Sequence, residues 1–146
     1  MVSLAGAEAY CQWLTETTGK THRLPTGIEW EKAARGSMSL VYSYGNRYLE
    51  SMANQQSGTV MKVGSFAQSD RGLFDMTGNV FEWMGNEYNV TQPGGPMNQE
   101  LRGGSFVLDG LYLRNSFRMR QSPTVMTDDI GFRVLREVES KTLKDD

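Results

Sequence analysis

The sequence has only one cysteine, Cys11, and one histidine, His22, among its 146 residues. A single cysteine excludes an internal disulfide framework and a zinc site built from several cysteines. A lone histidine with no identifiable serine or cysteine partner gives no support for a catalytic triad. We expect Cys11 to pack in the core, because free cysteine behaves as a small hydrophobic side chain. We expect His22 to be a surface or hydrogen-bonding residue.

A long apolar run and a strong excess of either charge are also missing. Fifteen basic and 17 acidic residues give a net charge of −2, which provides no general attraction for nucleic acid or an anionic membrane. No run approaches the roughly 18 apolar residues that cross a bilayer. The first residues also lack the basic leader and apolar core of a signal peptide. We therefore expect no nucleic-acid partner and no membrane span, and we favour a cytoplasmic location.

The length and the pattern of the chain predict one α+β domain over residues 1–138, followed by a polar tail over residues 139–146. A first helix is expected over residues 4–18, where apolar residues recur at spacings of three and four. A second helix is expected to begin after Thr26, which forms the capping-box pattern with Glu29.

The rest of the chain is rich in glycine, asparagine and serine and has poor periodicity. Short strands are expected at residues 60–66, 101–106, 115–120 and 130–138. The three tryptophans, Trp13, Trp30 and Trp83, are expected to anchor the core, because large aromatic side chains dominate small cores.

Asp75 and Glu82 lie on either side of a glycine turn, Gly78-Asn79. Calcium takes about six to eight oxygen ligands from carboxylates and carbonyls, and this turn could supply some of them. In the competing interpretation, Glu82 caps loop amides or pairs with an arginine. The residues alone favour this second interpretation, because the spacing is not that of an EF-hand.

A group of arginines begins with the Arg-Gly-Gly-Ser segment and continues after it, with three aspartates nearby in the sequence. In a strand, Arg118 and Arg120 point to the same side, where they could bind a carboxylate or phosphate through paired hydrogen bonds. More often such arginines form an ion-pair network with neighbouring acids, and we favour the network. The arginines are Arg102, Arg114, Arg118 and Arg120, and the acids are Asp109, Asp128 and Asp129.

Taken together, several segments of the chain resemble the formylglycine-generating enzyme, or sulfatase-modifying factor, family. The resemblance implies a fold like that of C-type lectins, with two helices, a small twisted sheet and long loops. Family domains usually carry strands before the first helix, so the resemblance implies that this chain is the later part of such a domain. A face left open by those strands would favour homo-oligomers or association with another chain. The segments, in family order, are AYCQWL, RLPTGIEWEKAARG, YSYGN, MAN, VGSF, GLFDMTGNVFEW, LRGGSF and GFRVL.

The resemblance also bears on catalysis. In the oxidase branch of the family, two cysteines after the RGGS motif bind copper and oxidise a substrate cysteine to formylglycine. Those positions correspond here to Leu108 and Leu113, and leucine supplies no thiolate ligand. Ser105 matches an active-site serine, but it has no cysteine to assist. We therefore expect no copper and no enzyme activity.

The same resemblance favours a structural calcium ion. Its ligands would be Asp75, the carbonyl groups of Gly78 and Val80, and Glu82, which match one of the family's calcium sites.

The resulting hypothesis is a non-catalytic, pseudoenzyme-type regulatory or binding module, part of a larger bacterial protein such as a serine/threonine kinase. Its partner would be a protein, a peptide or a small anionic ligand. The alternatives are an oxidase acting on cysteine peptides, a retroelement-diversified lectin-like receptor domain, and a structural role in oligomerisation. The mostly apolar segment 107–113 argues against the receptor. The expected ligand-binding residues are Arg102, Ser105, Asp109, Arg114, Arg118 and Arg120.

Overall fold

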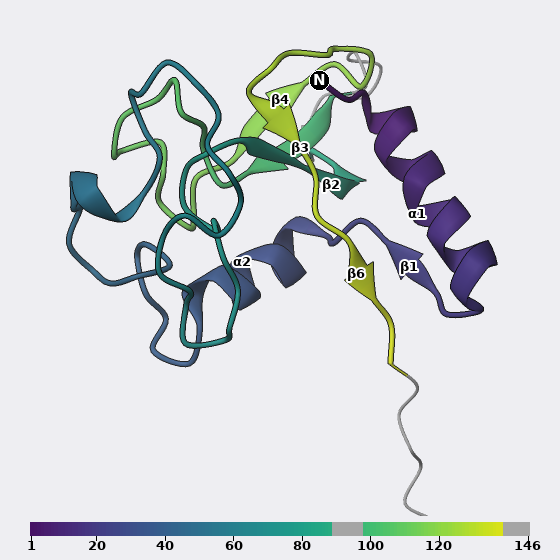
Figure 1. The fold of residues 1–146 in the computed structure, drawn as a ribbon, viewed down its shortest axis with the longest axis horizontal. Coiled ribbons are helices and arrows are strands. Elements are labelled where there is room, and N and C mark those ends of the chain that lie inside the picture. Colours follow the sequence, from purple (N-terminus) through teal and green to yellow (C-terminus); the bar gives the residue numbers. More distant parts are fainter. Residues whose placement is uncertain (89–97, 139–146) are drawn as a thin grey trace, which may run out of the picture.

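The computed structural model describes residues 1–88 and 98–138; the polar tail expected at residues 139–146 lies outside them. Within these ranges the strands form a four-stranded sheet in the order β4-β3-β2-β5 and a separate pair, β1-β6. In Figure 1, α1 lies on one side of the sheet and long loop segments lie on the other. The elements are α1 (Leu4–Thr18), β1 (His22–Arg23), α2 (Gly27–Arg35), the 3-10 helix η1 (Glu50–Met52), β2 (Phe81–Glu87), β3 (Gln99–Arg102), β4 (Met119–Gln121), β5 (Ile130–Gly131) and β6 (Leu135–Arg136).

Both predicted helices are confirmed. The N-cap of the α1 helix is Ser3, whose side chain accepts a hydrogen bond from the Gly6 amide. Its C-cap is Gly19, which has a left-handed backbone. The α2 helix begins at Thr26, and both hydrogen bonds of the capping box with Glu29 are present. Within the described residues, neither helix is long and apolar enough to cross a membrane.

The strand predictions are only partly right. The central strand β2 is not among the expected strands, and residues 60–66 form a loop rather than a strand. The segment expected at 130–138 is divided into β5 and β6. In the sheet, β2 and β3 are antiparallel with Glu82 opposite Arg102, while β2 and β5 are parallel. The β4 strand is antiparallel to β3, with Arg120 opposite Glu100.

The sheet separates two apolar clusters. Cys11 on α1 packs with Trp83 on one side, and Trp30 on α2 packs with Met76 and Met84 on the other. The core predictions for Cys11, Trp30 and Trp83 are thus confirmed.

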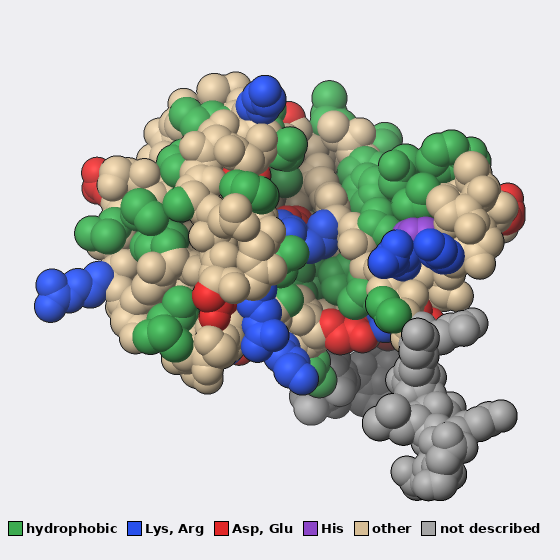
Figure 2. Space-filling view, turned by 60° about the horizontal axis from the view of Figure 1, so that its bottom comes forward, with side chains coloured by type: hydrophobic (Ala, Val, Ile, Leu, Met, Phe, Trp, Pro, Cys, Tyr) green, Lys and Arg blue, Asp and Glu red, His purple; other side chains and the backbone are tan. Residues whose placement is uncertain are grey.

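The core prediction for Trp13 is wrong. Trp13 is 54% exposed, because the buried residues Leu4, Ala7 and Cys11 define the inner face of α1 and Trp13 lies off that face. Its ring contacts that of Tyr10 at a centroid distance of 5.5 Å. Figure 2 shows hydrophobic side chains gathered over the α1 side of the molecule, beside the one histidine.

Candidate functional site

A network of ion pairs connects the sheet to α2. Arg102 donates from Nε to Glu100 Oε1 at 2.5 Å and from Nη1 to Glu31 Oε2 at 2.9 Å. Arg118 Nη2 donates to Glu100 Oε2 at 2.7 Å. Burial alone would raise the pKa of Glu100, but hydrogen bonds from Arg118 and Arg102 outweigh it and hold that pKa below the usual glutamate value.

The network confirms the favoured interpretation for Arg102 and Arg118, but the acids are not those expected. The partners are Glu31 and Glu100, not Asp109, Asp128 and Asp129. Glu100 and Arg102 are two positions apart in β3 and therefore share one face of the sheet. Glu31 comes from α2, a contact that the sequence spacing does not reveal.

The other arginines of the group lie at the surface. Arg114 is exposed, and its Nε donates to the Leu111 carbonyl at 3.0 Å. Arg120 is also exposed. The Arg118 guanidinium lies over the Tyr88 ring, 4.5 Å from its centroid, a cation–π contact. No salt bridge within residues 1–88 and 98–138 involves Arg114 or Arg120.

Two of the expected ligand-binding residues are buried. Arg102 is enclosed in the network, and Ser105 is fully buried with its hydroxyl donating to Asp129 Oδ2 at 3.1 Å. Asp109 is half-buried and its Oδ1 accepts from the Leu111 amide at 3.1 Å. The exposed arginines among the expected ligand-binding residues are therefore Arg114, Arg118 and Arg120.

The two leucines after the Arg-Gly-Gly-Ser segment pack against the protein. Leu113 is fully buried in a cluster with Tyr42 and Ala53. It lies so close to Gly104 that a Cβ atom there would overlap the leucine side chain, and Gly104 has a φ of +74°. Leu108 packs against the cluster beneath α1. Neither position offers a metal ligand.

The turn before β2 is held by a buried carboxylate. Glu82 accepts from Arg133 at both oxygens, each at 2.6 Å, and from the Trp30 indole N–H at 2.6 Å. Arg133 also donates to the Phe74 carbonyl at 3.2 Å. Asp75 Oδ2 accepts from the Gly64 amide at 2.7 Å. The sequence left open whether Glu82 pairs with an arginine. It does, and the arginine is Arg133.

This arrangement bears on calcium. The donor types at the turn, a carboxylate on each side and carbonyl groups between, suit a hard cation. A calcium ion would share Glu82 with the guanidinium of Arg133. Within the described part of the chain, no three acidic, histidine or cysteine side chains form a metal-binding cluster.

Comparisons with known proteins identify the family and the fold. The family model described as "Sulfatase-modifying factor enzyme 1-like domain" matches residues 1–138. The chain belongs to this family. The solved structure of PvdO from Pseudomonas aeruginosa superposes with a TM-score of 0.83 at 26% identity, covering 94% of this chain and 60% of that one. The predicted α+β class and the resemblance are confirmed.

Curated relatives differ in what their names state about activity. The chain is 36% identical to the inactive C-alpha-formylglycine-generating enzyme 2 of Mus musculus, over 90% of this chain and 46% of the relative. It is 30% identical to the formylglycine-generating enzyme of Mycobacterium tuberculosis, over 93% and 56%. It is 34% identical to the serine/threonine-protein kinase Pkn1 of Chlamydia trachomatis, over 94% and 24%. The chain thus spans about half or less of these relatives, and family membership leaves its activity open.

Proposed function

We propose that this domain is a non-catalytic module that binds an acidic segment of another protein. The observation that carries the proposal is the packing of Leu108 and Leu113, which stand where the oxidase branch has its copper-binding cysteines. Leu113 fills the interior beside Gly104, so the space that a reactive thiol would need is occupied by hydrocarbon. Cys11, the only cysteine of the sequence, is buried, and burial raises the pKa of its thiol.

The binding surface consists of three exposed arginines and the apolar side chains beside them. Arg114 and Arg120 form no salt bridge within the described residues. Leu111 and Tyr112 are 63% and 43% exposed. Arginine binds carboxylates through paired hydrogen bonds, and loops on a rigid scaffold commonly carry binding residues. A segment with acidic and apolar residues would complement this surface.

We further propose that the domain acts within a larger protein. Its Chlamydia relative is a serine/threonine kinase in which the matching region is 24% of the length. A binding module next to a kinase domain would select its substrate or regulate it. The proposed calcium ion would stabilise the turn that leads into β2, and it would have no role in chemistry.

The binding proposal is tested by fluorescence anisotropy with a labelled peptide of glutamate and phenylalanine, and with a lysine counterpart of the same length. We expect saturable binding of the acidic peptide only. The double variant Arg114→Gln, Arg120→Gln should bind at least tenfold more weakly, since each charged hydrogen bond contributes about 1.5–3 kcal/mol.

The matched control is Arg136→Gln, which removes an exposed arginine on β6 and should leave the affinity unchanged. Equal binding by the double variant and the wild type would show that these arginines do not form the site. Equal binding of the acidic and basic peptides would contradict the proposed partner chemistry.

A further inference from the structure

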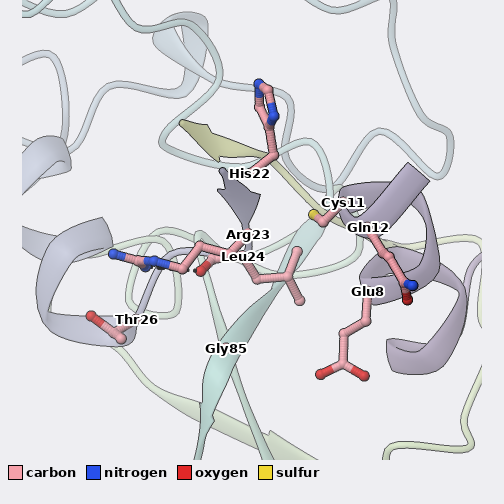
Figure 3. Close-up of a pocket in the computed structure, with 8 residues that line it drawn as sticks. All are labelled: Glu8, Cys11, Gln12, His22, Arg23, Leu24, Thr26 and Gly85. Carbon is pink, nitrogen blue, oxygen red and sulfur yellow. Dashed lines mark hydrogen bonds between the residues drawn. The ribbon is translucent and has the colours of Figure 1, made fainter. Parts of the chain in front are cut away.

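A pocket of about 420 Å³ lies between α1, β1 and β2, and Figure 3 shows the residues that line it. It shares no lining residue with the arginine surface. Its volume falls within the range of small-molecule sites, roughly 300–1,000 Å³. The proposed peptide binding does not use this pocket.

The inner wall of the pocket is apolar. Leu24 is 4% exposed and Cys11 is 3% exposed, and in Figure 3 the Leu24 side chain and the Cys11 sulfur point toward the space between the strands and α1. Gly85 on β2 contributes backbone alone, and a Cβ atom there would lie 3.1 Å from the Leu24 carbonyl oxygen. Burial raises the pKa of the Cys11 thiol, so it remains neutral. This wall suits a short hydrocarbon stem.

The one arginine in the pocket wall is fully paired. Arg23 donates from Nη1 and Nη2 to the two oxygens of Glu29, each at 2.7 Å. Its Nε donates to Glu137 at 2.7 Å. These three groups together carry a charge of −1, and all three guanidinium nitrogens are engaged. The Arg23 guanidinium is therefore not available to an anionic ligand in the pocket.

Glu8 contributes a carboxylate to the pocket wall. Glu8 lies on α1 at the pocket and is exposed. In the described residues it forms no salt bridge. Its neighbour in the pocket wall, Gln12, donates to Glu16 at 2.9 Å, and no hydrogen bond from this amide to Glu8 is present. Of the carboxylate and the guanidinium that line the pocket, the carboxylate of Glu8 is therefore the one available to a ligand of opposite charge.

We propose that this pocket binds a small organic cation with an apolar stem, such as an alkylamine or alkylguanidine. The headgroup would pair with Glu8, and the stem would lie on Leu24 and Cys11. The cation can be a free small molecule or the side chain of a lysine or arginine in a partner protein, since both present the same chemistry.

The test follows backbone amide shifts by NMR while n-butylguanidine, a cation with a hydrocarbon stem, is added, with pentanoate as the anion of similar length. We expect saturable shifts at Leu24 and Gly85 with butylguanidine and none with pentanoate. The variant Glu8→Gln should bind butylguanidine at least fivefold more weakly. The control Glu50→Gln, at the exposed 3-10 helix, should bind like the wild type.

Two additions sharpen the test. N-acetyl-arginine methylamide presents the same headgroup and the same charge on a peptide backbone, so tighter binding than butylguanidine would assign the site to a protein side chain, and weaker binding to a free cation. Bound cation should also slow the alkylation of Cys11, the only cysteine. An absence of saturable shifts, equal shifts with pentanoate, or unchanged binding in Glu8→Gln would overturn the proposal.

Discussion

At the scale of single residues, buried carboxylates organise the interior. Glu82 and Glu100 are both nearly inaccessible, with side-chain exposures of 7% and 2%, and each is paired with arginine. Isolated buried charges are very unfavourable, so each pair depends on the presence of both partners. Glu82 connects α2, through Trp30, to the segment after β5, through Arg133.

The variant Glu82→Gln should therefore be strongly destabilised. It leaves the guanidinium of Arg133 without its counter-charge, and breaking a buried pair in this way costs about 3–5 kcal/mol of unfolding free energy. Urea denaturation measures the difference. The control is Glu87→Gln, an exposed position in the same strand, which should stay within about 0.5 kcal/mol of the wild type. A loss below 1 kcal/mol in Glu82→Gln would contradict this role.

The ionisation of Glu29 makes the stability of the folded domain depend on pH. Hydrogen bonds from Arg23 and from the Thr26 amide lower its pKa to about 2 from 4.5. Because the folded-state pKa lies below the unfolded value, its stabilising contribution is complete above about pH 4.5 and is lost as the pH falls toward 2. The wild type should lose more thermal stability over this range than Glu29→Gln does. Parallel melting curves against pH would contradict the assignment.

At the scale of elements, local chemistry determines the helices and long-range contacts determine the sheet. The capping box at Thr26 is a short-range pattern, so α2 could be predicted from the sequence. The central strand β2 could not, because its buried residues do not alternate with exposed ones and it contains the acidic Glu82. A strand buried on both faces lacks the period-two signal, and the partner that neutralises Glu82 lies 51 residues away along the chain.

The candidate site shows the same division. The arginine group could be recognised from the sequence. That Arg118 and Arg120 share one side stays a prediction, because Arg118 lies just before β4 and not within it. The acids that pair with the group could not, because Glu31 reaches Arg102 from α2, 71 residues away. The burial of Ser105 was also inaccessible to sequence reasoning, since it depends on how the loop folds against Asp129.

The capping box provides a test at this scale. Replacing Thr26 with alanine removes the side chain that accepts from the Glu29 amide, and loss of such a cap costs about 1 kcal/mol of unfolding free energy. Chemical denaturation should show this loss. The exposed Thr17 on α1 serves as a control, because its replacement by alanine should change stability by less than about 0.5 kcal/mol. Equal effects at the two positions would contradict the capping role.

At the scale of the whole molecule, the fold is that of the family, and Leu108 and Leu113 stand where the resemblance places the copper-binding cysteines of the oxidase branch. The chain covers 60% of the PvdO chain. Function depends on the site rather than on the fold. The identity of Leu108 and Leu113 is therefore stronger evidence about activity than membership of the family is.

The proposed calcium ion is tested on the whole domain by thermal melting. Binding to the folded state alone raises the melting temperature, so the domain should melt higher in millimolar calcium than in chelator. The variant Asp75→Ala should lose this difference. Magnesium serves as the control, because it demands a smaller octahedral site. Identical melting temperatures in calcium and in chelator would contradict the proposed calcium site.

The proposal that the domain is non-catalytic is tested most directly by an oxidation assay. The domain is supplied with copper(I), a cysteine-containing peptide and oxygen, and the peptide is followed by mass spectrometry. We expect the domain in the presence of copper(I) to convert no peptide cysteine to formylglycine beyond a control with copper alone, because Leu108 and Leu113 cannot bind the metal. Conversion above that control would show that the domain is an oxidase after all.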